Sequence, residues 1–271
     1  MFRSISYCTK GNRESGVMEN LESKTILVTG SSKGIGKSIT ELLGSRGANI
    51  IAQYSSDEQG AQEATRLIPN ERKLLLQADF SHSNSYKELW KKSVAWKGKV
   101  DVLVANAAIM PETALTDSDA MWEQTWNNAM QVNSTSPAFL IRVAVLHFLQ
   151  EGGGTIIGIS SWAAQRGSGN PRLSAYAASK STVATLIKTI ARAYGKDEIY
   201  AYLVAPGIVR TAMSETSAKS LGGEEAVTAT LAMGEWVPPT EVAEMVGFLA
   251  TGKPKHLTGA TLDLNGATYI R

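Results

Sequence analysis

The sequence predicts an α/β protein whose single domain is a doubly wound, seven-stranded parallel sheet with helices on both faces. From residue 24 onward, short β-branched runs alternate with longer stretches of helical period, an order typical of parallel strands joined by crossover helices. Several of the runs are apolar nearly throughout, as in strands covered on both faces. Residues 29–36 place a glycine-rich turn between the first run and the first helical stretch.

Each expected strand is a short apolar or β-branched run, and the helical stretches between them end at Gly or Pro. In chain order, the expected strands are 25–29, 49–54, 73–78, 100–105, 155–160, 199–204 and 261–264. The expected helices are 34–46, 57–67, 85–96, 119–132, 137–150, 174–194 and 240–250.

One long segment, 211–239, has no clear period, and we interpret it as an irregular lid over a substrate site. No repeat or linker divides residues 23–271, so we expect one domain. Residues 1–22 mix charged, Ser, Asn and Gly residues without a continuous apolar core, so we expect a disordered extension rather than a secretion signal. A transit peptide, an expression remnant and a start at Met18 stay open for it.

The composition excludes several classes of protein. The chain has 271 residues, 43% hydrophobic and 19% charged, and 27 basic against 25 acidic residues leave a net charge of +2. This is too apolar for a disordered chain and too evenly charged for a protein that mainly binds nucleic acid. Cys8 is the single cysteine, and no Cys/His cluster has zinc-ligand spacing, so we expect no metal site. Apolar stretches such as 100–110 are too short to span a membrane, and a cytoplasmic location fits.

The glycine-rich turn indicates a nucleotide site. Glycines let the backbone approach a pyrophosphate, and the N-terminus of the following helix offers free N–H groups to bind it. A turn of this kind can also need glycine for purely structural reasons. The end of the turn, Gly36-Lys37-Ser38, looks like a P-loop, but five residues rather than four separate Gly30 from Gly36, so an NTPase is disfavoured.

Together with residues farther along, the turn resembles the short-chain dehydrogenase/reductase family, whose members have a Rossmann-type fold. The resemblance covers residues 24–267. Its motifs are Gly30-x-x-x-Gly34-x-Gly36, Tyr176-x-x-x-Lys180, Ser160-Ser161 at a strand end, Asn133 in a helix, and the turn from Pro206 to Thr211.

The resemblance implies four catalytic residues. Tyr176 would be the general acid/base, Ser161 would hydrogen-bond the substrate oxygen, Lys180 would bind the nicotinamide ribose, and Asn133 would hold a water in a proton relay. Tyr176 and Lys180 are four residues apart in a helical stretch and therefore share one face. We expect the ammonium, with an oxidised nicotinamide ring, to lower the phenol pKa from its free value of about 10. Ser160 is the alternative to Ser161 in this role, because the stretch 162–175 is longer than the usual family spacing.

The cofactor is expected to be NADP rather than NAD. The family's acidic position at the end of the second strand aligns with the uncharged Tyr54, while Lys33 places a cation in the glycine turn. Asp57 could imitate the determinant for NAD, although a helix-capping role is favoured for it. Ala108 replaces a glycine that many relatives have beside the cofactor. The expected cofactor-binding residues are Gly30, Ser32, Lys33, Gly34, Ile35, Gly36, Tyr54, Ser55, Ser56, Asp79, Phe80, Asn106, Ala107, Ala108, Tyr176, Lys180, Pro206, Gly207, Val209 and Thr211.

We therefore predict an NADP(H)-preferring oxidoreductase that acts on a small carbonyl or secondary alcohol. One alternative is a 3-oxoacyl-carrier-protein reductase, for which Arg142, Arg166, Arg172 and Arg192 are docking candidates; the other is a non-catalytic dinucleotide sensor or scaffold. The Trp/Lys stretch 90–99 is interpreted as a helix packed on the sheet rather than a nucleic-acid face. Helices 119–150 and 174–194 are expected to form a homodimer or homotetramer. Five apolar side chains are expected near the catalytic end: Met110, Trp162, Met213, Met233 and Trp236.

Overall fold

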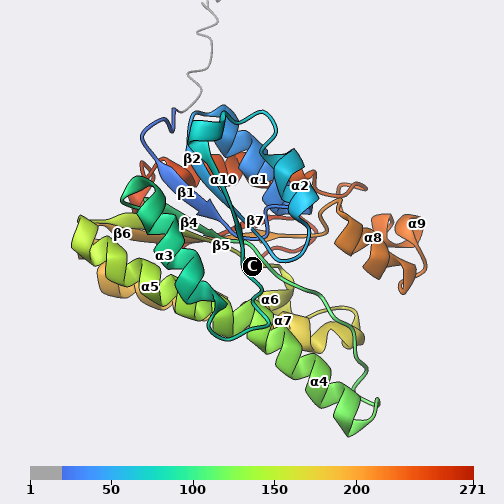
Figure 1. Cartoon of the computed structure of the whole chain (residues 1–271). Coiled ribbons are helices and arrows are strands. Elements are labelled where there is room, and N and C mark those ends of the chain that lie inside the picture. Colours follow the sequence, from blue (N-terminus) through green and yellow to red (C-terminus); the bar gives the residue numbers. More distant parts are fainter. Residues whose placement is uncertain (1–19) are drawn as a thin grey trace, which may run out of the picture.

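The computed structural model describes residues 20–271, and its centre is one parallel sheet of seven strands (Figure 1). The spatial order is β3-β2-β1-β4-β5-β6-β7. The strands are β1 (Thr25–Val28), β2 (Asn49–Tyr54), β3 (Lys73–Gln77), β4 (Val102–Ala105), β5 (Gly154–Ile159), β6 (Ile199–Pro206) and β7 (Thr261–Leu264). The predicted doubly wound fold is confirmed.

The strand order reverses beside β1. The chain moves from β1 to β2 and β3 on one side, then returns to pair β4 with β1 on the other side. In doubly wound folds, ligands bind in the crevice at the carboxyl ends of the strands where the order reverses. The glycine turn and Asn106 follow β1 and β4, so the topology alone brings them to one edge of the sheet.

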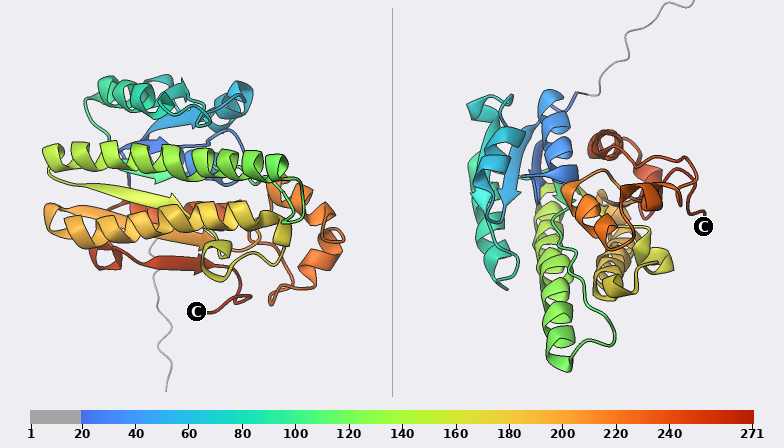
Figure 2. Two further views of the ribbon diagram at one scale, coloured as in Figure 1. Left: turned by 90° about the horizontal axis from the view of Figure 1, so that it is seen from below. Right: turned by 90° about the vertical axis from the view of Figure 1, so that its right-hand side faces the viewer.

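Helices cover both faces of the sheet (Figures 1 and 2). On one face lie α1 (Gly34–Ser45) and α10 (Pro239–Ala250), which pack against each other, with α2 (Glu58–Ala64) beside α1. On the other lie α3 (Ser85–Lys97), α5 (Ser136–Glu151) and α7 (Ser174–Tyr194). All eight residues of β6 are buried, as the apolar sequence of a strand covered on both faces predicts.

One long, continuous helical segment runs from residue 119 to residue 151 and packs on the sheet over its second half. It consists of α4 (Asp119–Met130), a π-helical turn (Gln131–Thr135) and α5 without a break. By length and composition, Asp119–Glu151 could cross a membrane, but most of its most apolar window is buried within the fold. It serves here as a core helix whose α5 half packs on the sheet.

Two details differ from the sequence prediction. The segment 211–239 is not irregular throughout: it contains α8 (Ala212–Lys219) and α9 (Glu224–Thr228). These helices were missed because each is short, and short amphipathic pieces give no periodic signal. Leu21, placed in the expected extension, is fully buried in the core and donates its N–H to the carbonyl of Arg46. Residues 1–19 of that extension, with Cys8, lie outside the described residues.

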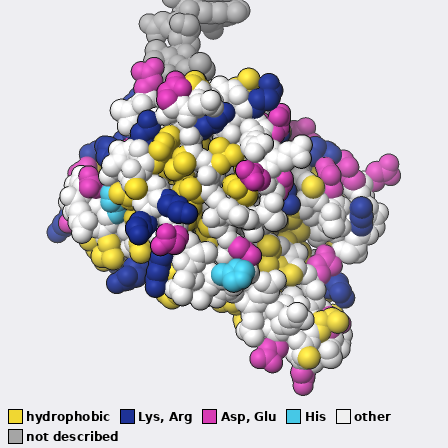
Figure 3. All heavy atoms as spheres, in the orientation of Figure 1, with side chains coloured by type: hydrophobic (Ala, Val, Ile, Leu, Met, Phe, Trp, Pro, Cys, Tyr) yellow, Lys and Arg dark blue, Asp and Glu magenta, His cyan; other side chains and the backbone are white. Residues whose placement is uncertain are grey.

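The remaining helical elements are short connections between these parts. They are α6 (Ala163–Arg166) and 3-10 turns at Asn70–Arg72, Pro171–Leu173, Gly195–Asp197 and Lys255–Leu257. On the face shown in Figure 3, basic and acidic side chains are mixed. Trp90 of α3 is buried in the core while Lys91 and Lys92 are exposed, which agrees with the packed-helix interpretation of that stretch.

Candidate active site

The glycine turn after β1 has a backbone that larger residues could not adopt or occupy. Gly30 has φ +69°, in the left-handed region that favours glycine. Gly36 packs so closely that a Cβ there would overlap the carbonyl oxygen of Gly30. The first turn of α1 is therefore pressed against the end of β1.

Two side chains from neighbouring strands hold this turn in place. The Oε1 of Gln53 accepts the N–H of Gly30 at 2.8 Å, and its Nε2 donates to the carbonyl of Ala78 at 2.7 Å. On the other side, Asn106 Nδ2 donates to the carbonyl of Thr29 at 2.8 Å. Sequence reasoning missed Gln53. An amide in the middle of an apolar strand is the signal that could have indicated its role.

The N-terminus of α1 fits a dinucleotide pyrophosphate. Lys33 occupies the N-cap position, and no side chain caps the helix there. The first N–H groups of the helix are thus without a capping side chain, and with the helix dipole they favour an anion. The exposed Lys33 lies beside them. These residues fit NAD(P), whose nicotinamide ring supplies or accepts hydride when bound.

The end of β2 combines a buried phenol with two exposed serines. Tyr54 is 8% exposed, and its pKa is raised, first by burial and then by the nearby Glu58 carboxylate. Ser55 and Ser56 are exposed in the loop that follows. Asp57 caps α2 by accepting the N–H of Gly60 at 2.8 Å, which is the capping role favoured for it.

The next two expected cofactor residues lie at the end of β3. Asp79 accepts the N–H of Ser81 at 2.9 Å, and this hydrogen bond is the main cause that lowers its pKa. Phe80 is buried, and its carbonyl accepts from Ser136 Oγ at 2.8 Å. The Phe80 side chain therefore belongs to the hydrophobic core.

Ser161 and Tyr176 meet at the carboxyl end of β5. Ser161 follows the strand, and its hydroxyl lies close enough to the Tyr176 phenol of α7 to lower the pKa of that phenol. Burial acts in the opposite direction and is the larger cause, so the pKa of Tyr176 is raised overall. In the chain alone, removing the phenolate from water costs more than Ser161 returns. The expected lowering of the phenol pKa includes an oxidised nicotinamide ring and stays a prediction.

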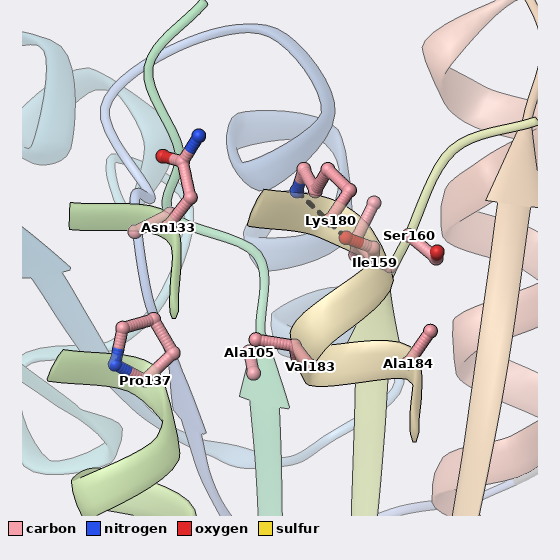
Figure 4. A pocket seen from close by; sticks show the side chains of 9 residues that line it. Ala105, Asn133, Pro137, Ile159, Ser160, Lys180, Val183 and Ala184 are labelled. Atoms are coloured by element: carbon pink, nitrogen blue, oxygen red, sulfur yellow. Dashed lines mark hydrogen bonds between the residues drawn. The ribbon is translucent and has the colours of Figure 1, made fainter. Parts of the chain in front are cut away.

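Lys180 is buried below the tyrosine. Its Nζ lies 6.0 Å from the centroid of the Tyr176 ring and donates to the carbonyl of Ile159 at 2.8 Å (Figure 4). Burial lowers the pKa of Lys180 to about 8. Lys180 is not among the groups that shift the pKa of Tyr176 in the chain alone.

Asn133 joins the π-helical turn to the two segments beside it. Its Oδ1 accepts the N–H of Ile109 at 2.8 Å, and its Nδ2 donates to the carbonyl of Ile109 and to Ser179 Oγ. Ser179 in turn donates to the carbonyl of Tyr176 at 2.7 Å. Ser179 is a second residue that sequence reasoning missed.

A small cavity lies between Asn133 and Lys180. It measures about 10 Å³ and is also lined by Ala107 and Ser160 (Figure 4). A polar cavity of this size is close to what one water molecule needs. Ser160 Oγ is buried without a hydrogen-bond partner among the described residues.

A larger cavity of about 610 Å³ opens in front of Ser161 and Tyr176. Residues of the lid form one wall, and the lid has its own apolar cluster of Ala218, Val227, Leu231 and Trp236. Of the apolar side chains expected at this end, Met110, Trp162 and Met213 line the cavity, whereas Trp236 packs inside the lid and Met233 is 63% exposed.

The predicted site residues therefore divide into three groups. Seven line the larger cavity: Ile35, Ser161, Tyr176, Pro206, Gly207, Val209 and Thr211. Three line the small one: Ala107, Asn133 and Lys180. The others line neither of these two cavities: Gly30, Ser32, Lys33, Gly34, Gly36, Tyr54, Ser55, Ser56, Asp79, Phe80, Asn106 and Ala108.

Comparison with known proteins gives a consistent result. A family model described as enoyl-(acyl carrier protein) reductase matches residues 30–267. The chain is 35% identical over 254 residues to the 3-oxoacyl-(acyl-carrier-protein) reductase FabG of Vibrio cholerae, covering 93% of this chain and 99% of that protein. It is 34% identical over 264 residues to 3beta-hydroxysteroid dehydrogenase 1 of Eggerthella lenta, covering 93% and 96%.

A solved structure agrees with these relatives. A dehydrogenase/reductase from Sinorhizobium meliloti 1021 superposes with a TM-score of 0.83 at 30% identity, covering 93% of this chain and 98% of that one. The match of fold, motifs and full-length relatives leads to one conclusion: the chain belongs to the short-chain dehydrogenase/reductase family of NAD(P)-dependent oxidoreductases.

Proposed function

We propose that the protein is an NADP(H)-preferring oxidoreductase that transfers hydride between the nicotinamide and a small carbonyl compound or secondary alcohol. The observation that carries the proposal is that Ser161 and Tyr176 lie together in the lining of a 610 Å³ cavity, with Lys180 behind the tyrosine ring. A cavity of this size suits a small-molecule site.

In the proposed reaction, the hydroxyls of Ser161 and Tyr176 bind the substrate oxygen. Tyr176 donates its proton to that oxygen in the direction of reduction and accepts it in the direction of oxidation. Lys180 would replace the proton on Tyr176, and a pKa of about 8 suits a group that must give up a proton near neutral pH. A water in the small cavity between Asn133 and Lys180 would connect Lys180 to solvent.

The preference for NADP rests on charge at the adenosine end of the crevice. The exposed Lys33 and the hydroxyls of Ser55 and Ser56 can bind a 2′-phosphate. The carboxylate of Asp57 already accepts the N–H of Gly60, which leaves it less available to a ribose 2′-hydroxyl. Glu58 is the opposing charge near this end of the site, and it lies beside the buried Tyr54.

A second candidate is reduction of a 3-oxoacyl group on a carrier protein, since a relative with 35% identity has that name. All four arginines considered for docking are exposed on the surface: Arg142, Arg166, Arg172 and Arg192. The steroid dehydrogenase at 34% identity shows that similarity of this degree does not select the substrate. A non-catalytic dinucleotide sensor is the alternative that the experiment below separates.

We also propose that the protein is a cytoplasmic homodimer or homotetramer that associates through α5 and α7. Three large apolar side chains of α5 are exposed: Phe139 at 44%, Leu146 at 45% and Leu149 at 41%. Contact between copies would cover them. Light scattering of the wild type and of Leu146→Lys tests this, and a monomeric wild type would contradict it.

The experiment that tests the function compares the wild type with Tyr176→Phe, using Tyr194→Phe on the same helix as the matched control. NADPH and NADH are titrated first, and we expect NADPH to bind at least about tenfold more tightly. On a carbonyl panel, Tyr176→Phe should lower kcat by about 10²- to 10⁴-fold without weakening NADPH binding.

Three results would contradict these proposals. Tighter binding of NADH would overturn the cofactor preference. Tight binding without turnover of any carbonyl by the wild type would favour the sensor. Equal losses in Tyr176→Phe and Tyr194→Phe would remove Tyr176 from the proton-transfer role.

A further inference from the structure

The larger cavity contains one charged side chain among its described lining residues, Arg166. No Asp, Glu, Lys or His lines it. Ser161 and Tyr176 stand on the same wall, so a molecule bound to these hydroxyls lies in a space whose only formal charge is positive. Such a space attracts an anion and rejects a cation.

Arg166 is held in a defined position by two aromatic rings. It is the last residue of α6, and its guanidinium carbon lies 4.3 Å from the ring centroid of Trp162 and 5.7 Å from that of Tyr269. Stacking of this kind occupies the faces of a guanidinium and leaves its N–H groups free at the edges. The two rings thereby hold the guanidinium so that its N–H donors have the geometry that a carboxylate or phosphate needs.

The other arginines at this end of the molecule are neutralised, whereas Arg166 is not. Arg172 pairs with Glu112, Arg210 with Glu224 and Arg271 with Asp263. Within residues 20–271, Arg166 takes part in no such ion pair, and its guanidinium has no hydrogen-bond acceptor. An arginine that lacks a carboxylate while its neighbours have one is an available anion-binding group.

A second polar group on the cavity wall also lacks a partner. Asn170 is 7% exposed, and its Oδ1 accepts the N–H of Arg172 at 3.0 Å, which fixes the amide orientation. Its Nδ2 is buried and has no acceptor in the described part of the chain. Because a buried donor without an acceptor is unfavourable, an oxygen atom from a ligand would satisfy it.

We propose that Arg166 binds an anionic group of the substrate, with Asn170 as a second donor, so that the enzyme acts on carbonyl compounds that also carry a carboxylate or phosphate. The proposal rests on the proposed oxidoreductase function. The substrate oxygen lies at Ser161 and Tyr176, and the anion lies at the end of α6. Apolar residues of the lid, among them Met213 and Val227, line the space available to the hydrocarbon part between them.

The test uses two matched substrate pairs with NADPH. The first pair is 4-oxopentanoate and its methyl ester. The second is acetoacetyl-pantetheine 4′-phosphate and acetoacetyl-pantetheine. For each pair, kcat/KM is measured in the wild type, Arg166→Gln, Arg166→Lys and the control Arg66→Gln, which removes an exposed arginine outside the cavity.

We expect the wild type to prefer the anionic member of at least one pair. Arg166→Gln should lower that preference roughly tenfold to hundredfold, Arg166→Lys should restore part of it, and Arg66→Gln should leave it unchanged. If Arg166→Gln lowers the preference for the anionic member only in the first pair, the ligand is a free oxo acid. If it lowers that preference only in the second pair, the ligand is the phosphate of a carrier arm.

Two outcomes separate failure of this proposal from failure of the proposed function. Turnover of both members with the same ratio in the wild type and Arg166→Gln would overturn anion recognition and leave the oxidoreductase assignment intact. Without turnover, calorimetric titration of the NADP-saturated protein with 4-hydroxypentanoate and pantetheine 4′-phosphate still tests Arg166. Equal affinities in the wild type and Arg166→Gln, or no binding of either compound, would contradict the proposal.

Discussion

The Nζ of Lys180 donates a 2.8 Å hydrogen bond to the carbonyl oxygen of Ile159, the last residue of β5. This bond ties the helix that carries Tyr176 to the strand that precedes Ser161. It also holds an ammonium in a buried place, and that burial lowers the pKa of Lys180 to about 8 from an ordinary 10.5.

The depressed pKa of Lys180 predicts how stability depends on pH. Between about pH 8 and 10.5 the unfolded chain binds this proton more tightly than the folded chain. The contribution of Lys180 to the free energy of unfolding therefore increases as pH rises. Lys180→Met removes that gain. Its stability relative to wild type should therefore fall by roughly 2–3 kcal/mol between pH 7 and pH 10. Urea unfolding of both proteins at the two pH values measures this, and a constant difference would refute it.

Lys33 should discriminate between the two nicotinamide cofactors. Lys33→Ala removes the exposed cation beside the N-terminus of α1, so NADPH affinity should fall about tenfold and NADH affinity less than about twofold. Fluorescence titration measures both. Lys37→Ala, four residues along the same helix and paired with Glu41, is the control. Equal weakening of both cofactors by Lys33→Ala would argue against 2′-phosphate recognition.

Gln53 should affect both cofactors alike, because it holds the glycine turn rather than the ribose. Gln53→Leu leaves the N–H of Gly30 and the carbonyl of Ala78 without their partners, at a cost of about 2–4 kcal/mol in the free energy of unfolding. Gln53→Glu keeps the acceptor for Gly30 and should recover part of the cofactor affinity. If the Gln53→Leu variant bound both cofactors with wild-type affinity, the glycine turn would not depend on the hydrogen bonds of Gln53.

Glu112 should hold the lid against the rest of the site. Its Oε1 accepts from Ser217 and Ser220 of the lid at 3.4 and 3.3 Å, and its Oε2 pairs with Arg172 at 3.4 Å. Glu112→Gln weakens the ion pair, so proteolysis within 211–223 should become severalfold faster and the substrate KM should rise. Glu123→Gln, an exposed residue of α4, is the control. Unchanged cleavage rates would show that the apolar cluster of the lid suffices to hold it.

The strands and most helices were predictable because buried parallel strands and long amphipathic helices have strong sequence periods. Strand β2 begins at Asn49 and ends at Tyr54, and α7 begins at Ser174 and ends at Tyr194, at the predicted positions. The short helices α8 and α9 of the lid were not predictable, since one or two turns carry too few residues for a period. The motif residues of the candidate site were found, whereas Gln53 and Ser179 were not, because their roles depend on partners distant in sequence.

The π-helical turn Gln131–Thr135 has a consequence for how the two halves of its helix can vary. Each residue added to or removed from an α-helix rotates everything beyond it by about 100°. Removing one residue from this turn would restore α-helical spacing and rotate α4, with Trp122 and Trp126, about its own axis while α5 stayed seated on the sheet. A single insertion or deletion in the turn can therefore rotate α4 about its axis and change which of its side chains pack against α7. The sequences of α4 and α5 themselves would stay the same.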